Sequence, residues 1–257
     1  MTRRGGPWAK MGAVDDRRQR NIIIGVAIVI LGAAVALVLA VVGGDDDDPT
    51  PTTTSTAPPS TTTTLPEATT TTVPAADLDL AAYPDLTTGS RFDDPVALVR
   101  GFATEVLGFD TDVVVGPLQQ GDTRSGEVEL HPPSSPVITT VAVRQISDDS
   151  WVVVAATTEP IRLDTPVAGT RIASPQPLLG AASAFEGHVD VMLYVDGQDV
   201  PVATTFVTGH GDGTLGDFSG QLRFRAPEGA TRGILVLSSP NGDDGTTIAA
   251  VAIRVRF

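Results

Sequence analysis

The sequence predicts a membrane-anchored protein with a single N-terminal transmembrane helix, a disordered Thr/Pro linker, a small α+β module and a C-terminal all-β sandwich. Three observations lead to this fold class. Residues 22–42 form an uncharged apolar run, residues 43–79 are rich in threonine and proline, and residues 166–257 contain short strand patterns separated by turn residues. The apolar run divides the chain into a short basic part and a long acidic part.

Residues 22–42 contain no charged residue, no hydrogen-bonding side chain and no proline. At about 1.5 Å per residue, a helix of this length spans roughly 30 Å, the thickness of a bilayer's hydrocarbon core. A helix also satisfies its own backbone polar groups in lipid. The run therefore predicts a membrane-spanning helix. A cleaved signal peptide is the alternative, since residues 38–40 would suit its cleavage site, although its apolar region is typically about 7–15 residues.

Charge predicts the orientation of this helix. Residues 1–21 carry six basic and two acidic residues, whereas the part after residue 42 carries 11 basic and 29 acidic residues. Basic residues beside a membrane helix stay in the cytoplasm, so we expect a cytoplasmic N-terminus and extracytoplasmic C-terminal domains in a single-pass cell-membrane protein. The acidic outer part argues against nucleic acid as a partner. The chain has no cysteine, which excludes disulfides and thiolate metal sites and is compatible with a bacterial envelope protein.

Residues 43–79 are predicted to be a disordered linker. Between Pro49 and Ala75 there are 13 Thr and 6 Pro, with few apolar residues, so this segment cannot bury enough surface to offset its ordering entropy. Proline keeps such a chain extended, with a reach of up to roughly 80 Å at about 3.1 Å per residue. The linker is either a simple spacer or a stalk whose composition suits O-glycosylation.

Residues 80–165 are predicted to form a small α+β module. Asp94 is a helix N-cap, Pro95 occupies the first helical position, and apolar residues at helical spacing continue to Leu107, where Gly108 ends the helix. Strand patterns follow, and the polar turn at residues 147–150 predicts a hairpin between the last two. The expected strands are Val113–Val115, Gly126–Leu130, Ile138–Ile146 and Trp151–Thr158.

Residues 166–257 contain seven strand candidates and no helical pattern, which predicts a two-sheet sandwich. The candidates are Thr170–Ala173, Leu178–Phe185, His188–Val195, Val200–Thr208, Asp217–Phe224, Arg232–Leu237 and Thr247–Phe257. In the last candidate, Val251, Ile253, Val255 and Phe257 alternate with Ala252, Arg254 and Arg256. We expect the arginines to lie on the outer face of a terminal strand, where they discourage edge-to-edge pairing.

Three motifs in this region occur in a distinctive order: Ile172–Pro175, Leu178–Gly187 with its Ala-Phe-Glu-Gly sequence, and Gly216–Ser219. The region of about residues 170–257 resembles the immunoglobulin-like (Gmad-type) domain of bacterial spore-germination proteins. This resemblance implies an immunoglobulin-like β-sandwich outside the membrane, with no enzymatic residues to carry over, and a link to spore germination. From the residues themselves, Phe185 is expected to fill the core between the sheets, and Gly187 to permit a tight connection into the next strand.

One strand carries a candidate carboxylate–histidine site. Glu127 and Glu129 alternate along it and His131 follows, a set that can bind a metal or perform acid/base chemistry. The same pattern arises on the solvent face of any half-buried strand, and we favour that interpretation. No glycine-rich loop between a strand and a helix supports nucleotide binding.

Two loops and one triad complete the candidate sites. Gly209–Asp217 and Asn241–Gly245 have residues typical of calcium loops, but the spacing of a helix-flanked calcium loop is missing, so we interpret them as solvated turns. Ser183, His188 and Asp190 contain the residue types of a hydrolase triad, without the turn that presents the nucleophile. We therefore predict no catalytic residue, no metal site and no cofactor.

The function expected from the sequence is non-catalytic. The outer domains would bind or scaffold an envelope protein or a cell-wall polymer, while residues 22–42 contact the membrane. The alternative is an envelope hydrolase, or a polysaccharide-binding accessory to one. A cleft with convergent carboxylates would favour the enzyme, and a filled sandwich with a flat patch would favour the binding protein.

Overall fold

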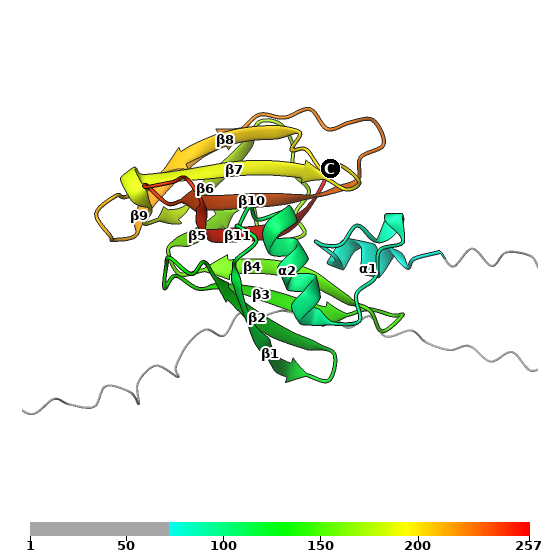
Figure 1. Cartoon of the computed structure of the whole chain (residues 1–257). Coiled ribbons are helices and arrows are strands. Elements are labelled where there is room, and N and C mark those ends of the chain that lie inside the picture. The colour runs from blue at the N-terminus through cyan, green and yellow to red at the C-terminus, as the bar shows by residue number, and fades with distance from the viewer. Residues whose placement is uncertain (1–71) are drawn as a thin grey trace, which may run out of the picture. The chain divides into compact units, whose positions relative to one another are not determined.

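The computed structural model describes residues 72–257 (Figure 1). The predicted cytoplasmic tail at residues 1–21, the predicted membrane helix at 22–42 and the linker up to residue 71 lie outside the described residues. Within residues 72–257, no helix has the length and apolar character needed to cross a bilayer. The helical elements are α1 (Ala75–Leu80), η2 (Leu86–Thr88), α2 (Pro95–Glu105) and η3 (Phe185–Gly187). The strands are β1 (Val114–Asp122), β2 (Ser125–His131), β3 (Thr139–Gln145), β4 (Trp151–Thr158), β5 (Ile161–Thr165), β6 (Gln176–Ala182), β7 (His188–Val195), β8 (Ala203–Thr208), β9 (Gly216–Leu222), β10 (Arg232–Pro240) and β11 (Thr247–Arg256).

The strands are joined into one continuous path of hydrogen bonds, in the order β1-β2-β3-β4-β11-β10-β7-β8. The last strand, β11, pairs with β10 on one side and with β4 on the other, where Ala252 lies opposite Ala156 and Ile253 opposite Ala155. Strands β5, β6 and β9 form a second layer, which β5 connects to β4 through one pair of residues. The predicted division into residues 80–165 and 166–257 stays a prediction, and hydrogen bonds join the strands across it.

The β-sandwich predicted for the C-terminal region is present. Its core lies between the β11-β10-β7 layer and the β5-β6-β9 layer, and the alternation along β7 directs Val189, Val191 and Leu193 into it. The large buried residues of this core are Ile161, Ile172, Leu178, Val189, Val191, Leu193, Val207, Phe218, Leu222, Leu235, Leu237, Val251 and Val255.

A second core lies on the other face of β10 and β11, where α2 packs over buried side chains of β2, β3, β4, β10 and β11 (Figure 1). Asp94 caps α2 by accepting a hydrogen bond from Val96 N at 2.9 Å, and Pro95 begins the helix, as predicted. Leu98, Val99, Phe102 and Ala103 from α2 are fully buried in this core. The strands β10 and β11 therefore have apolar contacts on both faces.

Burial on both faces corrects the prediction for the final strand. β11 is a central strand and not an edge, and only Arg256 of its two arginines is exposed. Arg254 is 5 % exposed, and its guanidinium binds the Asp196 carboxylate through two contacts of 2.5 Å. It also donates to the carbonyl oxygen of Leu78 at 2.9 Å. Arg254, which the alternation in β11 predicted to face solvent, therefore forms a buried ion pair with Asp196.

One strand prediction and one core prediction are also wrong. Residues 170–173 lie in the connection from β5 to β6 and form only a single parallel bridge, between Arg171 and Arg256 at the end of β11. Strand β5 is not among the predicted strands, and it pairs with β6. Phe185 does not fill the core, since it is 57 % exposed and packs over Gly242. The chain has already left the sheet at Ala182, and the turn η3 places Phe185 outside.

The linker predicted for residues 43–79 stays a prediction, and the described residues at its C-terminal end include the start of α1 at Ala75. Leu78 and Leu80 pack against a small apolar cluster next to β4. Polar contacts hold the segment on both sides. Asp77 accepts from the hydroxyl of Ser147 at 2.5 Å in the β3–β4 turn, and Asp79 forms an ion pair with Arg232 at 2.6 Å in β10. We call residues 74–92 the N-terminal strap.

We predict that Arg254→Ala destabilises the full-length chain by about 3–5 kcal/mol, because it leaves the Asp196 carboxylate without its partner. Arg256→Ala, which removes an exposed arginine two residues away, should cost no more than about 1 kcal/mol. Urea unfolding in detergent, followed by Trp151 fluorescence in a Trp8→Phe background, measures both effects. The double variant Arg254→Ala/Asp196→Ala should recover part of the loss. Equal effects of the two single arginine variants would contradict the buried ion pair.

Candidate functional site

The candidate carboxylate–histidine site predicted from the sequence lies on β2. Glu127, Glu129 and His131 alternate with buried Val128 and Leu130, and the His131 ring contacts the carbonyl oxygen of the next residue at 3.0 Å. Among residues 72–257, no group of three or more His, Asp or Glu side chains is arranged to hold a metal ion. The geometry is that of the polar side of a half-buried strand.

The triad candidates are only partly brought together. His188 Nε2 lies 3.0 Å from an Asp190 oxygen, and the His188 ring stacks on Phe206 with 5.1 Å between ring centroids. Ser183 lies beyond the end of β6, where its backbone bridges to His210. No hydrogen bond in the described part of the chain connects Ser183 to His188. The exposed His188–Asp190 pair therefore has no nucleophile in contact with it.

The two loops with calcium-like sequences contain self-contained turns. Asp212 accepts hydrogen bonds from the backbone N–H and hydroxyl of Thr214, at 3.0 and 2.6 Å, and Asp244 does the same for Thr246 at 3.0 and 2.8 Å. These bonds hold the pKa of both exposed carboxyls below the usual range; the Thr214 hydroxyl contributes most at Asp212 and the Thr246 N–H at Asp244. In each carboxylate, Oδ1 accepts both hydrogen bonds from within its own loop.

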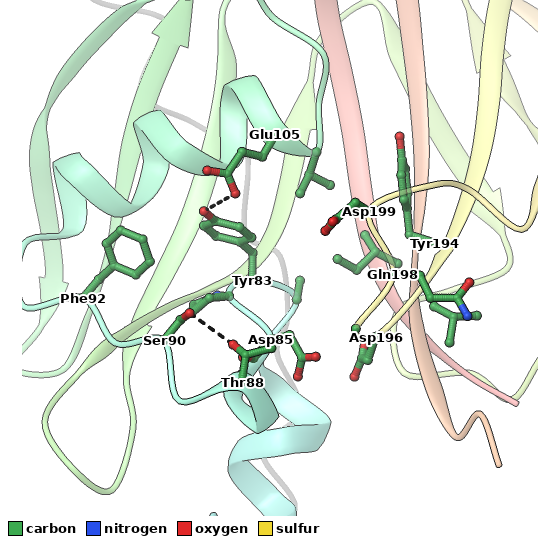
Figure 2. Close-up of a pocket in the computed structure, with 16 residues that line it drawn as sticks. Tyr83, Asp85, Thr88, Ser90, Phe92, Glu105, Tyr194, Asp196, Gln198 and Asp199 are labelled. Carbon is green, nitrogen blue, oxygen red and sulfur yellow. Dashed lines mark hydrogen bonds between the residues drawn. The ribbon is translucent and has the colours of Figure 1, made fainter.

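A pocket of about 850 Å³ lies where the N-terminal strap and α2 meet the turn between β7 and β8 (Figure 2). We call it the junction pocket, because its two walls come from residues far apart in the sequence. The strap and α2 contribute Ala82, Tyr83, Pro84, Asp85, Thr88, Ser90, Phe92, Glu105 and Val106, and the sandwich contributes Tyr194, Val195, Asp196, Gly197, Gln198, Asp199 and Ile234.

Tyr83 is the central side chain of the first wall. Its hydroxyl donates to Glu105 Oε2 at 2.8 Å, and its ring centroid lies 5.9 Å from that of Phe92 and 5.6 Å from that of Phe102. A Cβ at Gly101 would stand 2.8 Å from the Tyr83 hydroxyl oxygen, so glycine at this position lets the ring lie close to α2. Burial, followed by the Glu105 carboxylate, raises the pKa of Tyr83 well above its usual range.

Asp85 is the most unusual acidic group of the pocket. Its Oδ1 caps η2 by accepting from the N–H and hydroxyl of Thr87, at 2.9 and 2.7 Å. Its Oδ2 is buried and has no hydrogen-bond partner among the described residues. A Cβ on Gly197 would lie 3.3 Å from this oxygen, so Oδ2 is directed at the β7–β8 turn. A buried acceptor without a donor is rare, because its lost hydration is not replaced.

The sandwich wall presents Tyr194, Gln198 and Asp199 from the side opposite Tyr83 (Figure 2). Burial raises the pKa of Tyr194, whose ring lies half-buried at the end of β7. Asp196 lies at the base of the turn, where its ion pair with Arg254 fixes the start of the β7–β8 connection. Asp199 is exposed at the rim.

The pocket is acidic and aromatic. Its lining contains four carboxylates and three aromatic rings, and no Lys, Arg or His side chain from residues 72–257. The sequence does not reveal this pocket, because Tyr83-Pro84-Asp85 and Asp196-Gly197-Gln198-Asp199 each resemble an ordinary turn. Only the contact between the strap and the sandwich brings these two segments together, and the sequence of neither segment indicates that the other lies beside it.

Comparison with known proteins identifies the C-terminal part. Residues 160–246 match the immunoglobulin-like domain of bacterial spore germination, over about a third of the chain. The match confirms the resemblance seen in the sequence and begins ten residues earlier, so that it includes β5. That family is an immunoglobulin-like domain and not a known catalytic one. No curated protein and no solved structure gives a significant match to the chain.

The Tyr83–Glu105 contact can be tested by alkaline titration, because the chain has only two tyrosines. The usual pKa of a tyrosine is about 10. In a Tyr194→Phe background, we expect Tyr83 of the folded protein to ionise at a pH well above this value. The pKa of Tyr83 is higher in the folded state than in the unfolded state. The contribution of Tyr83 to the free energy of unfolding is therefore complete below about pH 10 and is lost as the pH rises through the folded-state pKa. Phenolate absorbance measures the titration, with circular dichroism reporting that the fold persists.

Glu105→Gln should lower the pKa of Tyr83 towards its usual range but not restore it, because burial remains the larger cause. Glu127→Gln, which removes an exposed carboxylate from β2 outside the pocket, should leave the titration unchanged. If Tyr83 ionised like a free tyrosine in the folded protein, the geometry of this wall would be wrong.

Proposed function

We propose that this chain is a non-catalytic binding protein of the bacterial cell envelope. Residues 22–42 would anchor it in the membrane with residues 1–21 in the cytoplasm, and the folded unit at residues 72–257 would be held outside by the linker. The apolar run and the basic residues before it support this placement. The germination-type domain at residues 160–246 supports a process linked to sporulation or germination.

The junction pocket is the observation that supports a binding role most directly. Its volume of about 850 Å³ lies within the range of roughly 300–1,000 Å³ found for small-molecule sites. It combines aromatic rings with carboxylate, amide and hydroxyl groups, the mixture that fixes the orientation of a polar ligand. The ligand or the partner's side chain would enter between the strap and the immunoglobulin-like domain, so that both contribute to recognition.

An envelope hydrolase is the second candidate, because the lining of the pocket contains four carboxylates. A general acid or base must be free to exchange a proton with the substrate. Both oxygens of Asp196 bind Arg254, Glu105 accepts from Tyr83, and one oxygen of Asp85 caps η2. These existing hydrogen bonds favour binding over proton transfer. The hydrolase would instead be established if the wild-type chain degraded cell-wall polymer and the variants Glu105→Gln and Asp199→Asn lost this activity.

The predicted orientation is tested by digesting intact cells with a non-specific protease. We expect the folded unit to be removed and an N-terminal fragment of about the first 45–75 residues to be protected, because the Thr/Pro-rich segment would be exposed outside. A cytoplasmic marker protein, which must stay intact, is the control. Full-length chain that survives while an established surface protein is cut would contradict the proposed placement.

The proposed binding role is tested by crosslinking from the pocket rim in intact cells. A photoreactive residue in place of Gln198 should yield a discrete product that contains an envelope protein or a wall fragment. The same residue in place of Glu127, on the polar face of β2, is the matched control and should yield less of that product. Products that contain only cytosolic proteins would count against an envelope function.

A further inference from the structure

We propose that the junction pocket binds an organic ammonium group, carried on a body with hydroxyl or apolar surface. This inference rests on the proposed binding function for its biological setting, but the chemistry comes from the pocket itself. A lysine side chain and an amino sugar both have this character. The shared feature is a positive, hydrogen-bond-donating nitrogen on a body large enough to contact aromatic rings.

The charge of the pocket selects a cation. Of its four carboxylates, only Asp196 is matched by an arginine, and that arginine lies behind the wall rather than in the lining. The remaining Asp85, Glu105 and Asp199 belong to the lining of the pocket, which contains no Lys, Arg or His side chain from the described residues. Anionic ligands such as phosphates would be repelled by this surface, whereas an ammonium group would gain attraction that is strengthened by partial exclusion of water.

The aromatic rings favour an organic cation over an inorganic one. Tyr83 and Tyr194 lie on opposite walls, and Phe92 extends the first wall (Figure 2). A cation over the face of such a ring is attracted by its quadrupole, and the carbon atoms next to the nitrogen contact the same surface. A bare metal ion would instead require several convergent oxygens, and residues 72–257 contain no such cluster.

The unpartnered oxygen of Asp85 supplies an independent indication of a donor. Its Oδ2 has lost its hydration and has no hydrogen bond among the described residues, although Oδ1 of the same carboxylate has two. A donor that reaches this oxygen would remove the cost of leaving it unsatisfied. Gly197 is the residue that faces it from the other wall, and glycine keeps a side chain away from the approach.

The experiment uses the full-length chain in detergent and two matched pairs of probes. One pair is Nα-acetyl-lysine amide and its Nε-acetylated form, and the other is glucosamine and N-acetylglucosamine. Calorimetry measures their affinity at low and high salt. We expect at least one of the amines to bind about tenfold more tightly than its acetylated partner, with an affinity that falls as salt is raised. The better pair indicates whether a peptide side chain or a sugar is the source of the ammonium.

The variant Asp85→Asn removes the charge but retains an oxygen that can cap η2. The variant Asp199→Asn removes the charge of the carboxylate at the rim. Each should weaken binding of the preferred amine by about fivefold or more. Asp212→Asn is the matched control, because Asp212 caps Thr214 as Asp85 caps Thr87 but lies outside the pocket. It should leave the affinity unchanged.

The inference is overturned if neither amine binds, if the acetylated probes bind equally well, or if Asp212→Asn weakens binding as much as Asp85→Asn. Unfolding midpoints of the variants show that each remains folded under the conditions of the assay. Because the probes act on purified protein, failure here leaves the protease result on intact cells untouched. The two proposals are thus tested separately.

Discussion

The pairing of β11 with β4 is the constraint on which the rest of the structure depends. It places the C-terminal strand inside the sheet, with one face in the sandwich core and the other against α2. A strand packed on both faces has no row of side chains facing water, so its polar residues must be paired. Both terminal nitrogens of Arg254 bind Asp196, and one also donates to the carbonyl oxygen of Leu78, while its buried Nε has no hydrogen-bond partner among the described residues. One strand thereby connects the sandwich, the helix and the N-terminal strap.

The junction pocket follows from this connection. The strap contacts the β3–β4 turn through Asp77 and the sandwich strand β10 through Asp79, so it bridges the sheet on which it lies. The same segment then continues into Tyr83 and Asp85, which form one wall, while the ion pair of Asp196 holds the base of the other. The pocket has fixed walls because both are tied to the shared sheet. A site of this kind is suited to recognising a ligand without a large rearrangement.

Local patterns in the sequence were sufficient for most elements. The acidic cap and proline before α2, the turn at residues 147–150, and the alternation in β7 each state a physical requirement within a few residues. Gly187 behaves as expected, with φ of 73° and no room for a Cβ beside the backbone of Gly209. These features could be predicted because the residues that determine them are neighbours in the chain.

The errors arose where distant segments decide the environment. The alternation in β11 suggested a solvent-facing side, because the sequence contains no sign that α2 and β4 cover it. Phe185 looked like a core residue, but the turn in which it lies projects it outwards. The pocket was missed for the same reason, since its walls lie about 110 residues apart and are joined only in three dimensions. Charge and turn chemistry at residues 196–199 were visible, but their partner at Asp85 was not.

Amide hydrogen exchange of the full-length chain, followed by mass spectrometry, tests most directly whether the shared sheet makes one folded unit. We expect peptides from β4 and β11 to exchange at the same slow rate as those from β10, because their hydrogen bonds open only when the whole unit unfolds. Peptides from β1–β4 that opened together at a much faster rate, while β6–β11 stayed protected, would contradict this. The two regions would then be separate bodies, and the pocket between them would have no fixed walls.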